Sequence, residues 1–173
     1  MIELLIIPIG DLDDEIIKDL AGRLESKFGV PQISSKMPVP QAAYNPCRNQ
    51  YDSWHLLKIL KNLPGNILLG ITHVDLYAEG LNFVFGRAEV GGRCCLISTA
   101  RLLHHDTKIF YNRIEKEAIH EIGHVLGLRH CSNRKCVMFF SNSIFDTDAK
   151  EAWFCERCFI AIDPRKFAIK SFH

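Results

Sequence analysis

The stretch of sequence that decides how this chain folds is HEIGHVLGLRHC, residues 120–131. His120 and His124 are four residues apart, which places their side chains on the same face of a helix. Gly127 follows one turn later, where a left-handed residue can end the helix and turn the chain so that His130 comes back toward the first two histidines. In a chain of this composition such a pattern arises by chance about 6 × 10⁻⁵ times. The stretch therefore predicts a helix that carries a metal site.

The ligand types in this stretch indicate the chemistry. Three imidazoles leave one position of a tetrahedral zinc open, which is the arrangement of a catalytic zinc. A water bound there is acidified toward a pKa of about 7 and can attack a polarised carbonyl. We expect His120, His124 and His130 to hold this zinc, and Glu121 to be the general base that passes the proton to the leaving amine. The alternative is an amphipathic helix whose histidines only face solvent.

Four cysteines gather in the last third of the chain. Cys131, Cys136, Cys155 and Cys158 have the two-pair spacing of a structural zinc site that four thiolates close. Disulfides or free thiols are the alternatives, and a reducing compartment disfavours bridges. Because Cys131 directly follows His130, such a site would fix the backbone that presents the third histidine. We therefore expect two Zn²⁺ per chain, one catalytic and one structural.

Composition and charge limit the classes of protein to which this chain can belong. A chain of 173 residues and 19.7 kDa fits one globular domain. Its net charge of +1 lacks the basic excess of nucleic-acid-binding proteins, so we expect no nucleic-acid partner. We find no apolar run near the ~20 residues that span a bilayer, and no basic leader. We expect a cytoplasmic protein, with a monomer favoured, that acts on a peptide or protein.

The apolar periodicity predicts an α/β order of elements. Strands are expected near residues 1–9, 30–34, 66–72, 81–85 and 93–98, and helices near residues 13–28, 52–63, 108–126 and 148–155. Pro31 cannot donate to a ladder, so the second strand is predicted to lie at a sheet edge. The last two strands flank the glycine-rich GRAEVGG and are predicted to form a hairpin.

The histidine series, followed by Cys131, Cys136, Met138 and a later CERC, resembles the archaemetzincins, a branch of the metzincin zinc peptidases. The resemblance implies an α/β (α+β) fold with a mixed twisted sheet of about five strands, three main helices and a small C-terminal zinc-stabilised subdomain. It divides the single metallopeptidase domain, 1–173, into residues 1–127 with the active-site helix and residues 128–173 with the cysteine site. It also implies that Met138 forms an apolar floor beneath the histidines, the Met-turn.

This chain departs from the family pattern at two places. Sixteen residues separate Met138 from Cys155, one fewer than in the family pattern. Phe139 and Phe140 stand where some metzincins carry a tyrosine that helps to bind metal or oxyanion, and neither ring can donate a hydrogen bond. No residue is therefore assigned to stabilise the oxyanion.

The function predicted from these residues is zinc-dependent hydrolysis of peptide bonds. Two alternatives stay open: a protein-binding module stabilised by structural zinc, with a degenerate or regulatory histidine site, and a hydrolase of a non-peptide amide. Glu121 favours an enzyme, because a module without chemistry has no use for a carboxylate there. We expect substrate to pair with the strand at 81–85. An apolar or aromatic residue after the cut should fit a wall formed by Phe139, Phe140, Ile144 and Phe145.

Overall fold

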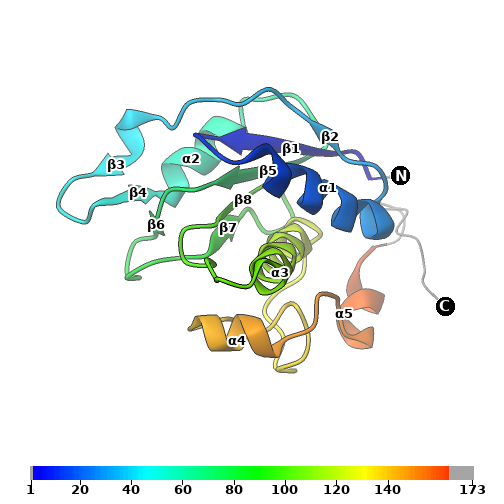
Figure 1. The fold of residues 1–173 in the computed structure, drawn as a ribbon. Helices are drawn as coiled ribbons and strands as arrows, with labels where there is room; N and C mark the ends of the chain where they lie inside the picture. Colours follow the sequence, from blue (N-terminus) through cyan, green and yellow to red (C-terminus); the bar gives the residue numbers. More distant parts are fainter. Residues whose placement is uncertain (1, 164–173) are drawn as a thin grey trace.

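A five-stranded mixed sheet forms the centre of the computed structural model, which describes residues 2–163 (Figure 1). The strands lie in the order β2 (Gln32–Ile33), β1 (Leu4–Ile9), β5 (Ile67–Thr72), β8 (Cys94–Ser98) and β7 (Gly86–Ala88). The first four run parallel, and β7 pairs antiparallel with β8 at one edge. The predicted sheet is confirmed, with the proline-led β2 at the other edge. Residue 1 of the predicted first strand lies outside the described residues.

Three main helices cover the two faces of this sheet. Helices α1 (Asp14–Phe28) and α3 (Thr107–Val125) pack together on one face, and α2 (Ser53–Leu60) lies on the other. Each begins at an aspartate whose side chain accepts a hydrogen bond from the backbone N–H two residues on. Because β5 and β8 are buried on both faces, their residues show no polar alternation.

A second, small sheet lies beside the main one and was not predicted. It consists of β3 (Tyr44–Asn45), β4 (Gln50–Asp52) and β6 (Leu76–Tyr77), preceded by the single turn η1 (Gln41–Ala43). Strands of two or three residues are too short to show a periodicity of two, so the sequence gives no sign of them.

The strand predicted at residues 81–85 is wrong in its position. The edge strand β7 begins only at Gly86, and residues 78–85 form a loop, the rim loop. Arg48 Nη2 donates to the carbonyls of Leu81 and Asn82 at 2.8 and 3.0 Å. The first half of this segment therefore bonds to a side chain, and only its end bonds to strands, through the Val84 N–H to the Leu76 carbonyl and the Ser98 N–H to the Phe85 carbonyl. The predicted hairpin is kept, because β7 takes the place of its first strand and pairs antiparallel with β8.

The short helix predicted at residues 148–155 is also wrong. Two helices, α4 (Ile144–Ala149) and α5 (Glu156–Ala161), lie on either side of most of that stretch. Cys155 is the N-cap of α5 and Cys158 is in its first turn, which directs both thiols to one side. A helix that ended at Cys155 could not bring the two thiols together in this way.

The chain after α3 packs into the same core as α1 and α3. Met138, Phe154 and Ile162 belong to one buried cluster with residues of both helices. The boundary between residues 127 and 128 stays a prediction, and residues 164–173 of the predicted subdomain lie outside the described residues. Within residues 2–163, no helix combines the length and the apolar character needed to cross a membrane.

Candidate metal centre and catalytic site

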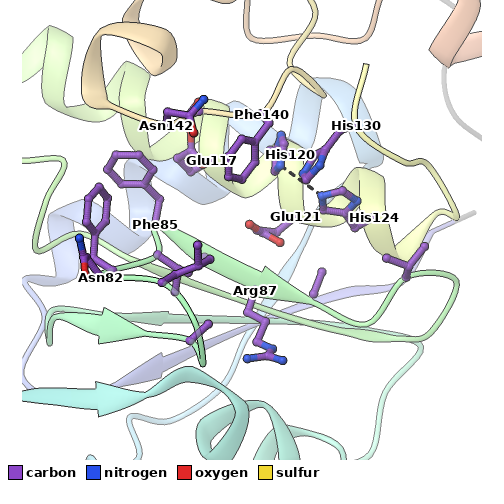
Figure 2. A pocket seen from close by; sticks show the side chains of 18 of the residues that line it. Asn82, Phe85, Arg87, Glu117, His120, Glu121, His124, His130, Phe140 and Asn142 are labelled. Carbon is purple, nitrogen blue, oxygen red and sulfur yellow. Dashed lines mark hydrogen bonds between the residues drawn. The ribbon is translucent and has the colours of Figure 1, made fainter. Parts of the chain in front are cut away.

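The three histidines converge where the sequence predicted. His120 and His124 project from the last turns of α3, Gly127 follows with φ 92°, and His130 returns to face them (Figure 2). The ring centroids lie 4.7 Å apart for His120 and His124, and 4.9 Å apart for His124 and His130. One ring nitrogen of each histidine lies within 4.8 Å of the other two. The left-handed glycine thus ends the helix and brings the third imidazole to the first two.

The hydrogen bonds of these rings determine which nitrogen is free. His120 Nδ1 lies 2.7 Å from the carbonyl oxygen of Val137, and His124 Nδ1 lies 2.8 Å from that of Leu128. A carbonyl only accepts, so each Nδ1 carries the proton and each Nε2 keeps a lone pair. Burial lowers the pKa of His120 well below its ordinary value and lowers that of His124 as well, which favours the neutral imidazole that binds metals.

The two free Nε2 atoms lie 3.2 Å apart, and with both Nδ1 atoms protonated neither can donate to the other. Two nitrogens bound to a tetrahedral zinc at ~2.05 Å are separated by about 3.3 Å. The donor set and its spacing therefore fit a zinc ion.

Glu121 lies between α3 and the edge strand, on the same cleft as the histidines (Figure 2). Burial raises the pKa of its carboxyl well above the ordinary value, and the nearby Glu117 carboxylate raises it further. Gly86 of β7 makes room for this side chain, since a Cβ at position 86 would lie 2.7 Å from Glu121 Oε1. Sequence reasoning missed Gly86, although a glycine within a predicted hairpin is a known sign of close approach.

Met138 lies against the active-site helix. It is fully buried, and its sulfur is the atom nearest to the position that a Cβ on Gly123 would occupy. The backbone around it holds two other parts of the site, because the Val137 carbonyl binds His120 and the Met138 carbonyl accepts from the Cys131 N–H at 2.9 Å. The apolar floor that the family resemblance implied is thus present next to the histidines.

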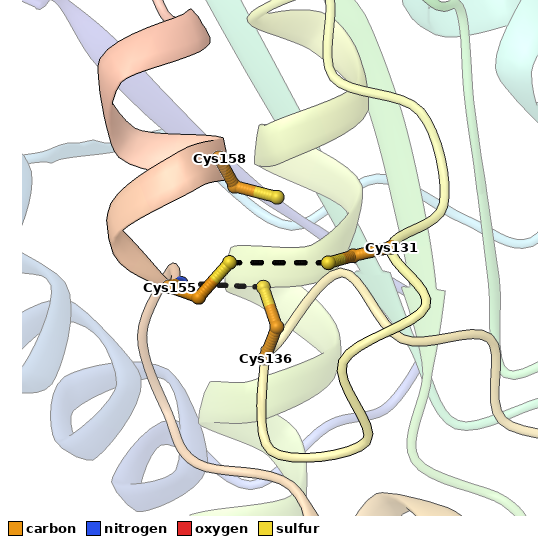
Figure 3. A group of neighbouring side chains, drawn as sticks. All are labelled: Cys131, Cys136, Cys155 and Cys158. Carbon is orange, nitrogen blue, oxygen red and sulfur yellow. Dashed lines mark hydrogen bonds between the residues drawn. The ribbon is translucent and has the colours of Figure 1, made fainter.

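The four clustered cysteines also come together, from the loop after α3 and the start of α5 (Figure 3). Cys131 Sγ and Cys155 Sγ lie 3.8 Å apart, and both are free thiols. Two thiolates on a tetrahedral zinc at ~2.3 Å are separated by about 3.8 Å, so the cluster fits a closed zinc site. Burial opposes ionisation of Cys131, but hydrogen bonds from the Asn133 N–H and the Arg157 guanidinium lower its pKa to about 7.

A cleft of about 590 Å³ runs between the sheet edge and α3. It is lined by the rim loop, β7, the three histidines, Glu117, Glu121 and the segment from Phe140 to Asn142. Of the four residues predicted to form its apolar wall, only Phe140 lines it, with its ring 4.9 Å from that of His130. Phe145 is 80% exposed, and Ile144 packs against the core. The predicted wall is therefore correct for one residue.

Sequence reasoning also missed a buried ion pair below this cleft. Lys150 Nζ lies 3.1 Å from Glu117 Oε1, and the two side chains are 0% and 3% exposed. The two residues are 33 positions apart, and no sequence pattern connects them.

Comparisons with known proteins agree with this geometry. The model of peptidase family M54 matches residues 16–164. The archaemetzincin of Methanocaldococcus jannaschii is 47% identical over 91% of both chains, and that of Pyrococcus furiosus is 40% identical over 94% of this chain and 93% of the relative.

Solved structures of archaemetzincins have the same fold. The crystal structure from Methanopyrus kandleri has a TM-score of 0.86 and 37% identity, and covers 95% of this chain and 94% of that one. The structure from Archaeoglobus fulgidus, complexed with malonate, has a TM-score of 0.83 and 42% identity. It covers 91% of this chain and 98% of that one. The chain belongs to peptidase family M54, the archaemetzincins, and is a zinc-dependent metallopeptidase.

Proposed function

We propose that His120, His124 and His130 hold the catalytic zinc and that Glu121 is the general base of peptide hydrolysis. The observation that carries this proposal is the pair of unprotonated Nε2 atoms, 3.2 Å apart, beside a buried carboxylate. Membership in a peptidase family favours peptide bonds over a non-peptide amide, and the buried Glu121 speaks against a binding module.

Each residue of the site then has a role that follows from its contacts. When bound, the zinc polarises the scissile carbonyl and makes water acidic enough to react near neutral pH. Glu121 takes a proton from the attacking water and returns it to the leaving amine. The Val137 and Leu128 carbonyls fix the tautomer and the orientation of His120 and His124. The free edge of β7 can align an extended peptide through main-chain hydrogen bonds.

We also propose that Cys131, Cys136, Cys155 and Cys158 hold a second, structural zinc, so that the chain binds two Zn²⁺. The proposal is supported by four convergent thiols and by the separation of 3.8 Å between two of them. Four thiolates carry a net charge of −2 with zinc, and Arg157, which donates to Cys131 at 3.3 Å, offsets part of it.

We propose that the protein works in the cytoplasm. All seven cysteines are free thiols, which is typical of a protein kept in the reducing cytoplasm. Membership in a peptidase family supports peptides or proteins as its substrates.

A digest of an unbiased peptide library tests the catalytic assignment. The wild type should cleave peptides, and Glu121→Ala should lose cleavage while its zinc content is unchanged, because all three imidazoles remain. His124→Ala should lose both cleavage and the catalytic zinc. Turnover retained by a verified Glu121→Ala sample would overturn the assignment of the base.

A further inference from the structure

Glu117 is a cleft residue that the proposed mechanism does not use. It lies one helical turn before Glu121 on α3 and lines the same cleft, although it is only 3% exposed. Its Oε1 atom lies 3.1 Å from Lys150 Nζ and accepts a hydrogen bond from Thr147 Oγ1 at 2.9 Å. Burying such a pair carries a large desolvation penalty, so the presence of a carboxylate at this place calls for an explanation.

The hydrogen bonds around Glu117 leave one of its two carboxylate oxygens free to accept a hydrogen bond from a ligand in the cleft. The Thr147 hydroxyl has a single proton and gives it to Glu117, so the Ser141 hydroxyl, 3.1 Å away, donates to Thr147 in turn. Both the ion pair and this hydrogen bond involve Oε1. Within residues 2–163 every fully buried side-chain oxygen has a partner, and Oε2 makes no hydrogen bond. Oε2 therefore remains open to the cleft as an acceptor.

The surroundings of Glu117 form a subsite with apolar sides. Phe85 and Phe140 lie on either side of it, and Asn142 lies close by (Figure 2). A substrate side chain that enters here passes aromatic rings and meets a carboxylate oxygen. The sequence led us to expect the wall after Met138 to face the residue directly after the scissile bond, and Phe140 of that wall lines this subsite.

We propose that Glu117 determines specificity by selecting, directly after the scissile bond, a side chain that ends in an N–H or O–H donor and by rejecting one that ends in a carboxylate. An ionised carboxylate only accepts hydrogen bonds, so a second carboxylate is left unpaired and repelled. Lys150 holds Glu117 in place and supplies its counter-charge. The inference rests on the proposed peptidase function, and it replaces the apolar preference expected from the sequence.

Isosteric peptides test this directly. Two peptides that differ only by Gln or Glu after the cut, and a second pair with Tyr or Phe, are compared by kcat/KM. The wild type should prefer Gln over Glu by ~10- to 100-fold, the range expected for a hydrogen bond to a charged group. Tyr should be preferred over Phe. Equal cleavage of Gln and Glu by the wild type would overturn the proposal.

Substitutions of Glu117 and Lys150 test whether this ion pair is the source of the preference for Gln over Glu. Glu117→Gln should bring the Gln-to-Glu ratio close to one, because an amide both donates and accepts. Since that change leaves the Lys150 ammonium buried alone, the double variant Glu117→Gln/Lys150→Met is measured as well. Glu25→Gln removes an exposed carboxylate from α1, outside the cleft, and serves as the matched control, in which the ratio should be unchanged. A wild-type ratio in the folded double variant, or a loss of the preference in Glu25→Gln, would overturn the proposal.

Equilibrium binding separates this inference from the proposed function. The same peptides are titrated into Glu121→Ala by calorimetry, where no turnover is needed, and Gln should bind at least about 10-fold more tightly than Glu. If no peptide is cleaved by the wild type, the proposed function fails, and the binding ratio still decides this inference. If cleavage depends on Glu121 but both peptides bind equally, only this inference fails.

Discussion

Replacing Gly86 with alanine tests how the edge strand positions the proposed general base. A Cβ at this position would lie 2.7 Å from Glu121 Oε1 and 2.6 Å from the Leu96 carbonyl oxygen. Ordinary contact begins at 3.4 Å, so the carboxylate and β7 must move apart by about 0.7 Å. Overpacking of this kind lowers the free energy of unfolding by ~1–3 kcal/mol.

The displacement should affect turnover more than metal binding. A misplacement of about 1 Å can reduce the rate ~10²-fold, so we expect Gly86→Ala to lose about 10- to 100-fold in kcat/KM, mainly in kcat. Zinc content should be unchanged, because the nearest atoms to the new Cβ belong to Leu96 and Glu121 and not to a histidine. The assay combines steady-state kinetics on one library-derived peptide, a thermal melt and a zinc measurement.

Gly22→Ala provides the matched control for this experiment. A Cβ on Gly22, in the middle of α1, would meet nothing within 4 Å, so the change should stabilise the helix by ~0.5–1 kcal/mol and leave kcat unchanged. A folded Gly86→Ala protein with wild-type kcat would refute the reasoning that this glycine makes room for Glu121.

Two further substitutions test the surroundings of the histidines. Gly123→Ala places a Cβ against the sulfur of Met138 and should lower the free energy of unfolding by ~1–3 kcal/mol in a denaturant titration; an unchanged value would show that the floor can move aside freely. Phe140→Ala should raise KM with little loss of stability, because its ring lines the cleft and is 41% exposed, whereas Phe145→Ala should change neither; equal KM values for both variants would contradict the role of Phe140 in the cleft.

The metal-binding parts were predictable because their geometry is local. The spacing of His120 and His124 follows from the helix itself, and Gly127 encodes the turn that returns His130. The cysteine pairs are similarly close in sequence, so the clustering of their thiols could be predicted. The strands β1, β5 and β8 were predictable for the same reason, because each is one continuous apolar run.

The parts that could not be predicted depend on distant polar contacts. The rim loop has the apolar alternation of a strand, but Arg48, more than thirty residues earlier, binds its carbonyls. Arg101 packs over the Phe83 ring and pairs with Asp75. Neither interaction leaves a periodic signal in the sequence.

The apolar wall was predicted wrongly because the charged pair at the bottom of the cleft, Glu117 and Lys150, lies outside the sequence motif. The four aromatic and aliphatic residues from Phe139 to Phe145 indicated an apolar pocket, yet only Phe140 faces it. In the sequence, Glu117 looks like any other polar residue of the predicted helix. Lys150 looks like an ordinary residue near the end of a helix. Only the packing of α4 against α3 brings them together.

A stepwise chelator titration tests the central claim most directly, with zinc content, peptidase activity and ellipticity read from the same samples. The open histidine site should release one equivalent of zinc first, and with it all activity, while the fold remains intact. The closed cysteine site should release a second equivalent only as the chain unfolds. A single bound zinc, simultaneous release of both, or activity that survives loss of the first equivalent would contradict the account.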